Sequence, residues 1–132
     1  MTPFLETERL ILRQFTDDDV DELLALDLDP LVRRFVEDGE PVNREEAADT
    51  VRHFRAYYER GDVYGFWVAE EKATGKFLGW FHFRPLPDAP ADEPELGYRL
   101  VADAWNKGYG TEGSRALIDM GFRTPHVQRV VA

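Results

Sequence analysis

The chain has 132 residues, of which 43% are hydrophobic, and it contains no cysteine. Twenty-six acidic residues against sixteen basic ones leave a formal net charge of −10. A chain of this length buries roughly two-thirds of its unfolded surface, so we expect one ordered domain over residues 1–132. The acidic balance disfavours nucleic acid and anionic membranes as partners, and the lack of cysteine excludes disulfides, thiolate nucleophiles and cysteine-based metal sites.

No segment indicates export, membrane insertion or metal binding. The N-terminal sequence MTPFLETERL lacks the basic start and long apolar run of a secretory signal. No stretch approaches the roughly 20 apolar residues that span a bilayer. The three histidines, at positions 53, 82 and 126, have no recognisable ligand spacing. We therefore expect a cytoplasmic protein without a bound metal.

The first part of the chain predicts a strand and then helices. Residues 8–15 mix β-branched and large apolar side chains with polar ones, which is typical of a half-buried strand. Thr16 followed by Asp19 is a capping arrangement for a helix that ends near Leu28. A short helical piece over 31–36 comes next.

The rest of the chain predicts one more helix followed mainly by strands. Asn43 with Glu46 repeats the cap signature, and two aromatic-rich segments flank a turn at Ala73-Thr74-Gly75. The expected elements are a helix over 43–61, a hairpin of strands 64–71 and 76–84, an exposed loop over 85–94, a strand over 95–101, a helix over 111–122 and a strand-like segment over 127–132.

The loop 105–111, between an expected strand and an expected helix, carries two glycines one residue apart. Gly108 and Gly110 let the backbone approach a ligand closely, and free N–H groups at the start of a helix form a ready anion site that would fit a pyrophosphate. The alternative is that both glycines only make a tight turn. The pattern matches neither the phosphate-binding P-loop nor the dinucleotide fingerprint.

Two adjacent motifs, ELGYRLV and WNKGYGTEGSRALIDMGF, resemble the GCN5-related N-acetyltransferases, particularly the subgroup that acetylates ribosomal-protein N-termini. The order of strands and helices, the N-terminal TERLILRQFTDDDVDELLAL and the GKFLGW segment belong to the same resemblance, which covers nearly the whole chain. It implies an α/β acyl-CoA N-acyltransferase fold, with a mixed, mostly antiparallel sheet flanked by helices. The implied activity is direct transfer of an acetyl group from acetyl-coenzyme A to a primary amine.

The resemblance also implies how acetyl-coenzyme A is held. Backbone N–H groups from about Asn106 to Thr111 would bind the pyrophosphate, and free amides at the end of the 95–101 strand would hold the thioester carbonyl and pantetheine. Trp105 stands where the wider family has Gln or Arg, although the subgroup often has Trp there. Gly97 either permits a bulge in the strand or packs tightly against a neighbouring side chain. The expected cofactor-binding residues are Leu100, Val101, Asn106, Lys107, Gly108, Tyr109, Gly110 and Thr111.

Acetyl transfer requires a base, because a primary amine with a pKa near ~10 is mostly protonated at neutral pH. The resemblance assigns this role to Glu95, and the alternative is a surface carboxylate beside Pro94. His82 is a second candidate base, since histidine titrates near neutrality, and its alternative is a packed or hydrogen-bonded strand residue. The expected acceptor is a peptide amine, a polyamine or an aminoglycoside, and its candidate contacts are Arg33, Phe35, Trp67, Trp80 and Phe83. The alternative is that most of these aromatic residues belong to the core.

Family members continue past the strand that corresponds to 127–132, with a helix and at least one strand. Those elements carry an Asn that contacts the pantetheine and commonly a Tyr that protonates the leaving thiolate, and the chain stops before them. It is therefore a fragment of a transferase, a subunit completed by another chain, or a non-catalytic acyl-coenzyme A binding or assembly module. An unpaired apolar edge at 127–132 favours pairing with another strand, which predicts a homodimer.

Overall fold

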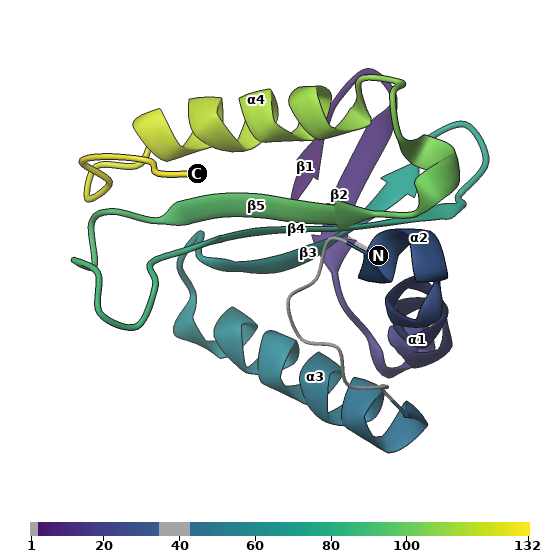
Figure 1. Ribbon diagram of the computed structural model, residues 1–132. Coiled ribbons are helices and arrows are strands. Elements are labelled where there is room, and N and C mark those ends of the chain that lie inside the picture. The colour runs from purple at the N-terminus through teal and green to yellow at the C-terminus, as the bar shows by residue number, and fades with distance from the viewer. Residues whose placement is uncertain (1–2, 35–42) are drawn as a thin grey trace.

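The computed structural model describes residues 3–34 and 43–132 and is built around a five-stranded antiparallel sheet in the order β1-β2-β3-β4-β5 (Figure 1). The hairpin of β3 and β4, the exposed loop after it and the strand β5 confirm the predicted elements. The bounds are β1 Leu5–Glu6, β2 Leu10–Gln14, β3 Gly65–Glu71, β4 Phe77–Arg84 and β5 Glu95–Leu100.

The predicted strand over 8–15 is shorter than expected and has a partner that the sequence did not reveal. β1 pairs antiparallel with β2, Leu5 opposite Leu12, and Thr7 closes the turn by donating its N–H to the Leu10 carbonyl at 2.9 Å. Two residues are too few for an alternating pattern to be recognised, which is why β1 was missed.

The predicted helices are present within the described residues, although positions 35 and 36 of the short helical piece lie outside them. Thr16 and Asp19 form a capping box, and the Asn43 side chain accepts the Glu46 N–H at 2.9 Å. The helix over 43–61 ends as 3₁₀ turns, and the last helix begins two residues earlier than predicted. The bounds are 3₁₀ turns at Asp17–Asp19, Tyr57–Arg60 and Ala102–Ala104, and helices α1 Val20–Leu28, α2 Pro30–Arg33, α3 Arg44–Ala56 and α4 Tyr109–Phe122.

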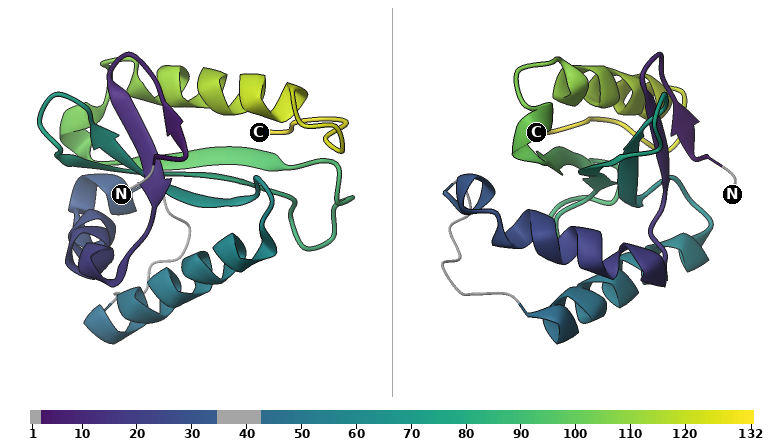
Figure 2. Two further views of the ribbon diagram at one scale, coloured as in Figure 1. Left: turned by 180° about the vertical axis from the view of Figure 1, so that it is seen from behind. Right: turned by 90° about the vertical axis from the view of Figure 1, so that its right-hand side faces the viewer.

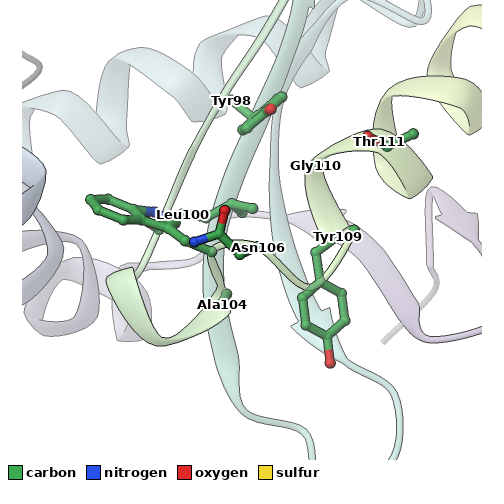
Figure 3. A pocket seen from close by; sticks show the side chains of 9 residues that line it. Tyr98, Leu100, Ala104, Asn106, Tyr109, Gly110 and Thr111 are labelled. Carbon is green, nitrogen blue, oxygen red and sulfur yellow. The ribbon is translucent and has the colours of Figure 1, made fainter.

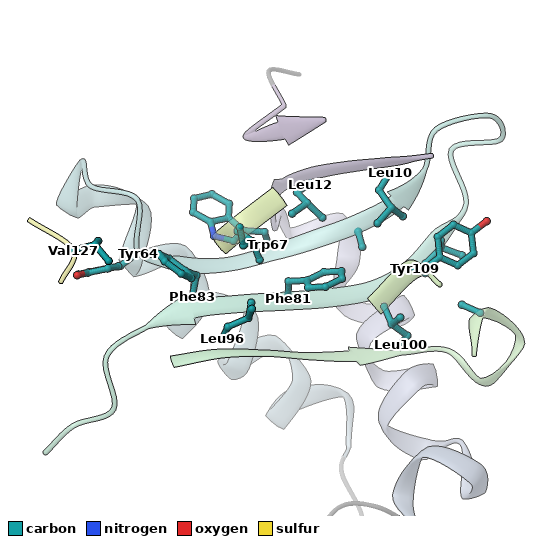
Figure 4. Packing of buried hydrophobic residues seen from close by; sticks show 14 residues of the cluster. Leu10, Leu12, Tyr64, Trp67, Phe81, Phe83, Leu96, Leu100, Tyr109 and Val127 are labelled. Atoms are coloured by element: carbon teal, nitrogen blue, oxygen red, sulfur yellow. The ribbon is translucent and has the colours of Figure 1, made fainter. Parts of the chain in front are cut away.

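The helices cover opposite faces of the sheet, with α1, α2 and α3 on one side and α4 on the other (Figures 1 and 2). Alternate residues of β4 therefore enter two separate cores. Phe81 and Phe83 belong to the cluster beneath α4, which Figure 4 shows, whereas Trp80 packs against the cluster of α1 and α3. α4 approaches so closely that a Cβ on Gly113 would lie 2.3 Å from Phe81. In the part of the chain that the structure describes, no helix is long and apolar enough to cross a membrane.

The C-terminal segment folds back along β5, so the prediction of an unpaired edge is wrong at Val131. Val131 forms a parallel bridge with Glu95, and Leu96 donates its N–H to the Val131 carbonyl at 2.7 Å. The turn after Arg123 brings this segment to the sheet, and Val127 is buried in the core beneath α4. The sheet is thus mixed, with one parallel contact added to an antiparallel arrangement.

Candidate functional site

The loop between β5 and α4 leaves the first turn of α4 without a side-chain cap. Asn106 and Gly108 have positive φ angles of 62° and 83°, and Gly108 is the N-cap of α4. Gly108 has no side chain with which to cap the helix, so no side-chain cap forms at this position of the described structure. The N-terminal N–H groups of a helix lack intrahelical partners and carry partial positive charge, so this end of α4 can bind an anion.

A cavity of about 430 Å³ opens at this end of α4 (Figure 3). The close approach of Gly110 to the Tyr98 ring shapes it, because a Cβ on Gly110 would lie 2.5 Å from the Tyr98 Cζ atom. The lining combines backbone of the loop with aromatic and small side chains. The lining residues are Tyr98, Leu100, Ala104, Trp105, Asn106, Gly108, Tyr109, Gly110 and Thr111.

Six of the eight predicted cofactor-binding residues line this cavity, and two do not. Val101 donates its N–H to the Leu78 carbonyl at 2.8 Å, so the expectation of a free amide is wrong at this residue. Lys107 is exposed and lies outside the lining, while its carbonyl accepts a hydrogen bond from Arg9 Nη1 at 2.8 Å. β5 also stays paired with β4 through Leu100.

Some N–H groups of β5 project from its other edge, away from β4. Leu96 directs its N–H away from β4, toward Val131. Because successive residues alternate, the N–H groups of Tyr98 and Leu100 project from that same edge. The Leu100 carbonyl on this edge accepts the Trp105 Nε1–H at 2.9 Å, which fixes the indole beside the cavity.

An ion pair absent from the sequence predictions holds the start of α4 against β2. Glu112 accepts from Arg9 Nε at 2.7 Å, from the Arg9 N–H at 2.9 Å and from the Thr7 hydroxyl. Burial alone would raise the pKa of Glu112, but these hydrogen bonds outweigh it and hold the pKa below its ordinary value. Arg9 and Glu112 lie 103 residues apart in the chain, and no local sequence pattern predicts such a contact.

Tyr109 completes the attachment of this helix end. Its ring lies under the Arg9 guanidinium, 4.2 Å from the ring centroid, and its hydroxyl donates to Glu71 Oε2 at 2.8 Å. The bond to Glu71 raises the pKa of Tyr109. Bonds from Thr74 and Tyr109 lower the pKa of Glu71. The loop is therefore fixed by side chains on its outer side, while its backbone faces the cavity.

The two candidate bases are hydrogen-bonded to each other on the α1 and α3 side of the sheet. His82 Nε2 lies 3.0 Å from Glu95 Oε1, and Arg84 Nη1 lies 3.7 Å from the same oxygen. Burial, then the Arg84 charge, lower the pKa of His82, and Glu95 only partly opposes them. Sequence reasoning treated His82 and Glu95 as alternatives, because the register of β4 against β5 was unknown.

Gly97 does not make a bulge, so that prediction is wrong and the alternative of tight packing is confirmed. Gly97 pairs directly with His82, and a Cβ on it would lie 2.7 Å from the His82 ring atoms Cε1 and Nε2. The bulge of this sheet lies instead between Ala69 and Glu70 of β3.

The candidate acceptor contacts are divided between the two faces. Trp80 lies on the α1 and α3 face, with the Arg99 guanidinium carbon 5.4 Å from its ring centroid, and Arg33 Nη1 donates to the Asp27 carbonyl at 3.3 Å. Trp67 and Phe83 are buried under α4, which confirms for these two residues the alternative that they belong to the core and makes their prediction as acceptor contacts wrong. Phe35 lies outside the described residues.

A buried ion-pair cluster on the α1 and α3 face stabilises the fold near the end of β2. Arg13 makes two bonds of 2.8 Å to Asp19 and one of 2.6 Å to Glu70. Burial alone would raise the pKa of Asp19, but the Arg13 and Thr16 hydrogen bonds outweigh it and lower the pKa below its ordinary value. The described ranges contain no group of three or more acidic or histidine side chains that could hold a metal ion.

Comparisons with known proteins agree with this geometry. The family described as acetyltransferase (GNAT) domain matches residues 9–132. An uncharacterized N-acetyltransferase, YoaA of Bacillus subtilis (strain 168), is 31% identical over 136 residues, which cover 100% of this chain and 73% of YoaA. The FsC-acetyl coenzyme A-N(2)-transacetylase of Aspergillus fumigatus is 28% identical, over 98% of this chain and 57% of its own length.

Solved structures of acetyltransferases have the same fold. The acetyltransferase from Agrobacterium tumefaciens str. C58 superposes with a TM-score of 0.73 and 26% identity, covering 95% of this chain and 70% of that one. RimL, described as a ribosomal L7/L12 alpha-N-protein acetyltransferase in complex with coenzyme A, has a TM-score of 0.78 and 18% identity. That match covers 98% of this chain and 72% of RimL.

Proposed function

This chain belongs to the GNAT acetyltransferase family, and we propose that it transfers the acetyl group of acetyl-coenzyme A to a primary amine by direct attack. The observation that carries the proposal is the cavity at the uncapped start of α4, where Gly108 has no side chain to cap the helix and Gly110 leaves room for the Tyr98 ring. That donor set fits a pyrophosphate, since it offers several N–H groups at the positive end of a helix.

The N–H groups of Tyr109, Gly110 and Thr111 would hold the pyrophosphate. The amides on the open edge of β5, at Tyr98 and Leu100, would bind the pantetheine and the thioester carbonyl. Backbone donors aimed at a developing oxyanion stabilise the transition state without reorganisation. Coenzyme A supplies the activated acetyl group, and the protein supplies its position.

Glu95 would act on the amine from the α1 and α3 side, where it meets His82. The amine nitrogen forms a bond to the thioester carbonyl carbon, and the carbon–sulfur bond breaks with its electron pair on sulfur. The surplus proton on nitrogen passes to Glu95, and the sulfur takes a proton from solvent. A general base of this kind typically contributes about 10²–10⁴ to the rate.

The acceptor class we propose is a peptide N-terminus or a small-molecule amine. RimL is described as acting on the N-terminus of ribosomal L7/L12, and the Aspergillus relative as an N(2)-transacetylase. The net charge of −10 would favour a cationic acceptor over an anionic one.

Calorimetric titration with acetyl-coenzyme A tests the cofactor half of the proposal. Gly108→Asp should weaken binding about 100-fold, because a carboxylate at this N-cap would itself accept the first N–H groups of α4. Losing two hydrogen bonds from those groups to the charged pyrophosphate costs about 3 kcal/mol. Gly61→Asp is the matched control, since Gly61 also has a positive φ, of 71°, and lies outside the cavity lining. If Gly108→Asp binds as well as the control, the glycines only make a turn.

Turnover tests the transfer half. The chain is incubated with acetyl-coenzyme A and, separately, a serine-terminal peptide, an alanine-terminal peptide, a polyamine and an aminoglycoside, and products are identified by mass. Acetylation of at least one amine supports the proposal. Binding without acetylation of any of them favours the second candidate, a non-catalytic acyl-coenzyme A binding module.

A further inference from the structure

The two carboxylate oxygens of Glu95 have different surroundings. Oε1 lies 3.0 Å from His82 Nε2 and 3.7 Å from Arg84 Nη1. Within residues 3–34 and 43–132, both of these contacts are to Oε1 and none is to Oε2. The Glu95 side chain retains 27% of its exposure and that of His82 retains 14%, so the carboxylate is the more accessible member of the pair.

The His82 ring reaches Glu95 because residue 97 has no side chain. His82 on β4 faces Gly97 on β5, and its Cε1 and Nε2 atoms lie 2.7 Å from where a Cβ would be. The ring therefore lies over β5 itself, on the strand that also provides Tyr98 and Leu100 to the cavity. The rings of Phe66 and Trp80 pack around it at centroid distances of 5.7 and 5.9 Å.

The neighbouring charges determine which atom carries the hydrogen. Burial and the Arg84 charge lower the pKa of His82, so its imidazole is neutral near pH 7. A carboxylate accepts hydrogen bonds only, so a neutral imidazole in contact with an ionised Glu95 must carry its hydrogen on Nε2. Arg84 does not make this bond in the described structure, since its Nη1 atom lies 3.7 Å from Oε1 and has no hydrogen-bond partner.

We propose that His82 is a positioning residue for acetyl transfer: its Nε2–H holds Oε1 of Glu95 and leaves Oε2 directed at the attacking amine. The inference rests on the proposed function, which makes Glu95 the proton acceptor. The amine proton moves to Oε2 as the nitrogen–carbon bond forms and the carbon–sulfur bond breaks. His82 keeps its own hydrogen throughout, and Glu95 later returns the proton to solvent.

Three variants separate positioning from a merely structural role. His82→Leu removes the donor and should lower kcat about 10-fold or more, the scale of one hydrogen bond to an ionised group. The KM for acetyl-coenzyme A should stay unchanged. His82→Gln places an amide N–H near the position of Nε2 and should recover most of kcat. His126→Leu, at an exposed histidine in the turn after α4, is the matched control and should behave as the original chain.

The kinetic outcomes decide the inference on the amine that the original chain acetylates best. A kcat for His82→Leu equal to that of His126→Leu overturns it, and so does a failure of His82→Gln to exceed His82→Leu. Gly97→Ala offers an independent route, because the added methyl displaces the ring without removing any functional group. It should lower kcat as His82→Leu does, while the far-ultraviolet circular dichroism stays unchanged.

A spectroscopic readout does not depend on the acceptor. Long-range proton–nitrogen spectra of the unliganded chain should show His82 as the neutral Nε2–H tautomer near pH 7, with shifts that change in Glu95→Gln. A neutral ring with its hydrogen on Nδ1 overturns the inference, because Nε2 would then have no hydrogen to donate. If the original chain acetylates no amine in the panel, the proposed transfer fails, and the tautomer still decides whether His82 orients Glu95.

Discussion

The two sides of β5 present different chemical groups. Toward α4, the cavity is lined by uncharged side chains and loop backbone, Gly108 leaves the helix without a side-chain cap, and the helix presents its own N–H groups. Toward α1 and α3, the strand carries charged side chains that are paired across strands or to a helix, as Glu95 is with His82 and Arg99 with Asp27. The α4 side thus suits a ligand that stays the same from one reaction to the next. On the α1 and α3 side, single side chains can be exchanged to suit different acceptors.

The two sides should therefore respond to different kinds of substitution. A backbone site depends on conformation and on empty space, so adding atoms damages it. A side-chain site depends on donors, acceptors and charge, so removing atoms damages it. We therefore expect cofactor affinity, the rate of acetyl transfer and the free energy of unfolding to respond separately to substitutions on the two sides.

The largest effect should come from a charge that supports the fold and not the reaction. Asp19→Asn removes the charge that pairs with Arg13, whose side chain is only 11% exposed. We expect a loss of about 3 kcal/mol in the free energy of unfolding, as for other broken buried pairs, measured by urea denaturation. Asp17→Asn is the matched control, because the Asp17 pair with Arg55 is exposed and should contribute less than about 1 kcal/mol. Equal losses in the two variants would contradict this account.

Glu95→Gln should separate chemistry from cofactor binding. We expect the rate of acetyl transfer to fall about 100-fold or more, since the variant lacks the general base. The affinity for acetyl-coenzyme A should stay unchanged, because Glu95 does not line the cavity. Glu93→Gln, in the loop before β5, serves as the control. A matching loss of affinity for acetyl-coenzyme A in Glu95→Gln would contradict the separation of cofactor binding from proton transfer.

Gly110→Ala should have the opposite signature. The added Cβ meets the Tyr98 ring at 2.5 Å, and because Tyr98 is half exposed, the ring can swing into the cavity. We expect affinity for acetyl-coenzyme A to fall about 10-fold, the equivalent of about 1.4 kcal/mol.

Stability distinguishes this crowding from general damage to α4. Alanine favours a helix over glycine by about 1 kcal/mol, so Gly110→Ala should remain as stable as the original chain. Gly121→Ala in the same helix meets the buried Phe83 ring at 2.8 Å and should lose stability with little change in affinity. The reverse pattern would count against the assigned cavity.

The smallest effect concerns acid stability. Because the pKa of Asp19 is lower in the folded chain than in the unfolded one, the unfolded state binds more protons as pH falls. The contribution of Asp19 is therefore fully present above its unfolded pKa, near ~3.9, and is lost as pH drops through the folded pKa. Urea unfolding at stepwise lower pH should show a shallower acid decline in Asp19→Asn than in the original chain. Identical slopes would mean that the pair does not titrate with folding.

Much of the fold and the backbone half of the site followed from local patterns. The capping box at Thr16 and the cap at Asn43 were predictable because a cap involves residues two or three positions apart. The strand, glycine loop and helix around Gly108 were predictable for the same reason. β1 was missed because a two-residue strand has no period to detect.

The side-chain half of the site depended on the register between strands. Nothing local predicts that His82 faces Gly97 and bonds to Glu95, because a shift of one residue would move each side chain to the other face. The same holds for Arg9 with Glu112, which the close packing of α4 on β2 brings together. The Gly97 bulge failed because glycine was needed there for space, not for backbone freedom.

Mapping of amide chemical shifts during titration with coenzyme A tests the central claim, that the cofactor binds at the α4 side of β5. The account predicts the largest changes at the N–H groups of Gly108 to Thr111 and of Tyr98, with little change in α3. A second cavity of about 620 Å³, lined by Arg52, Arg55 and Glu59 among others, offers a clear alternative location. Changes concentrated there, with the α4 loop unaffected, would contradict the account.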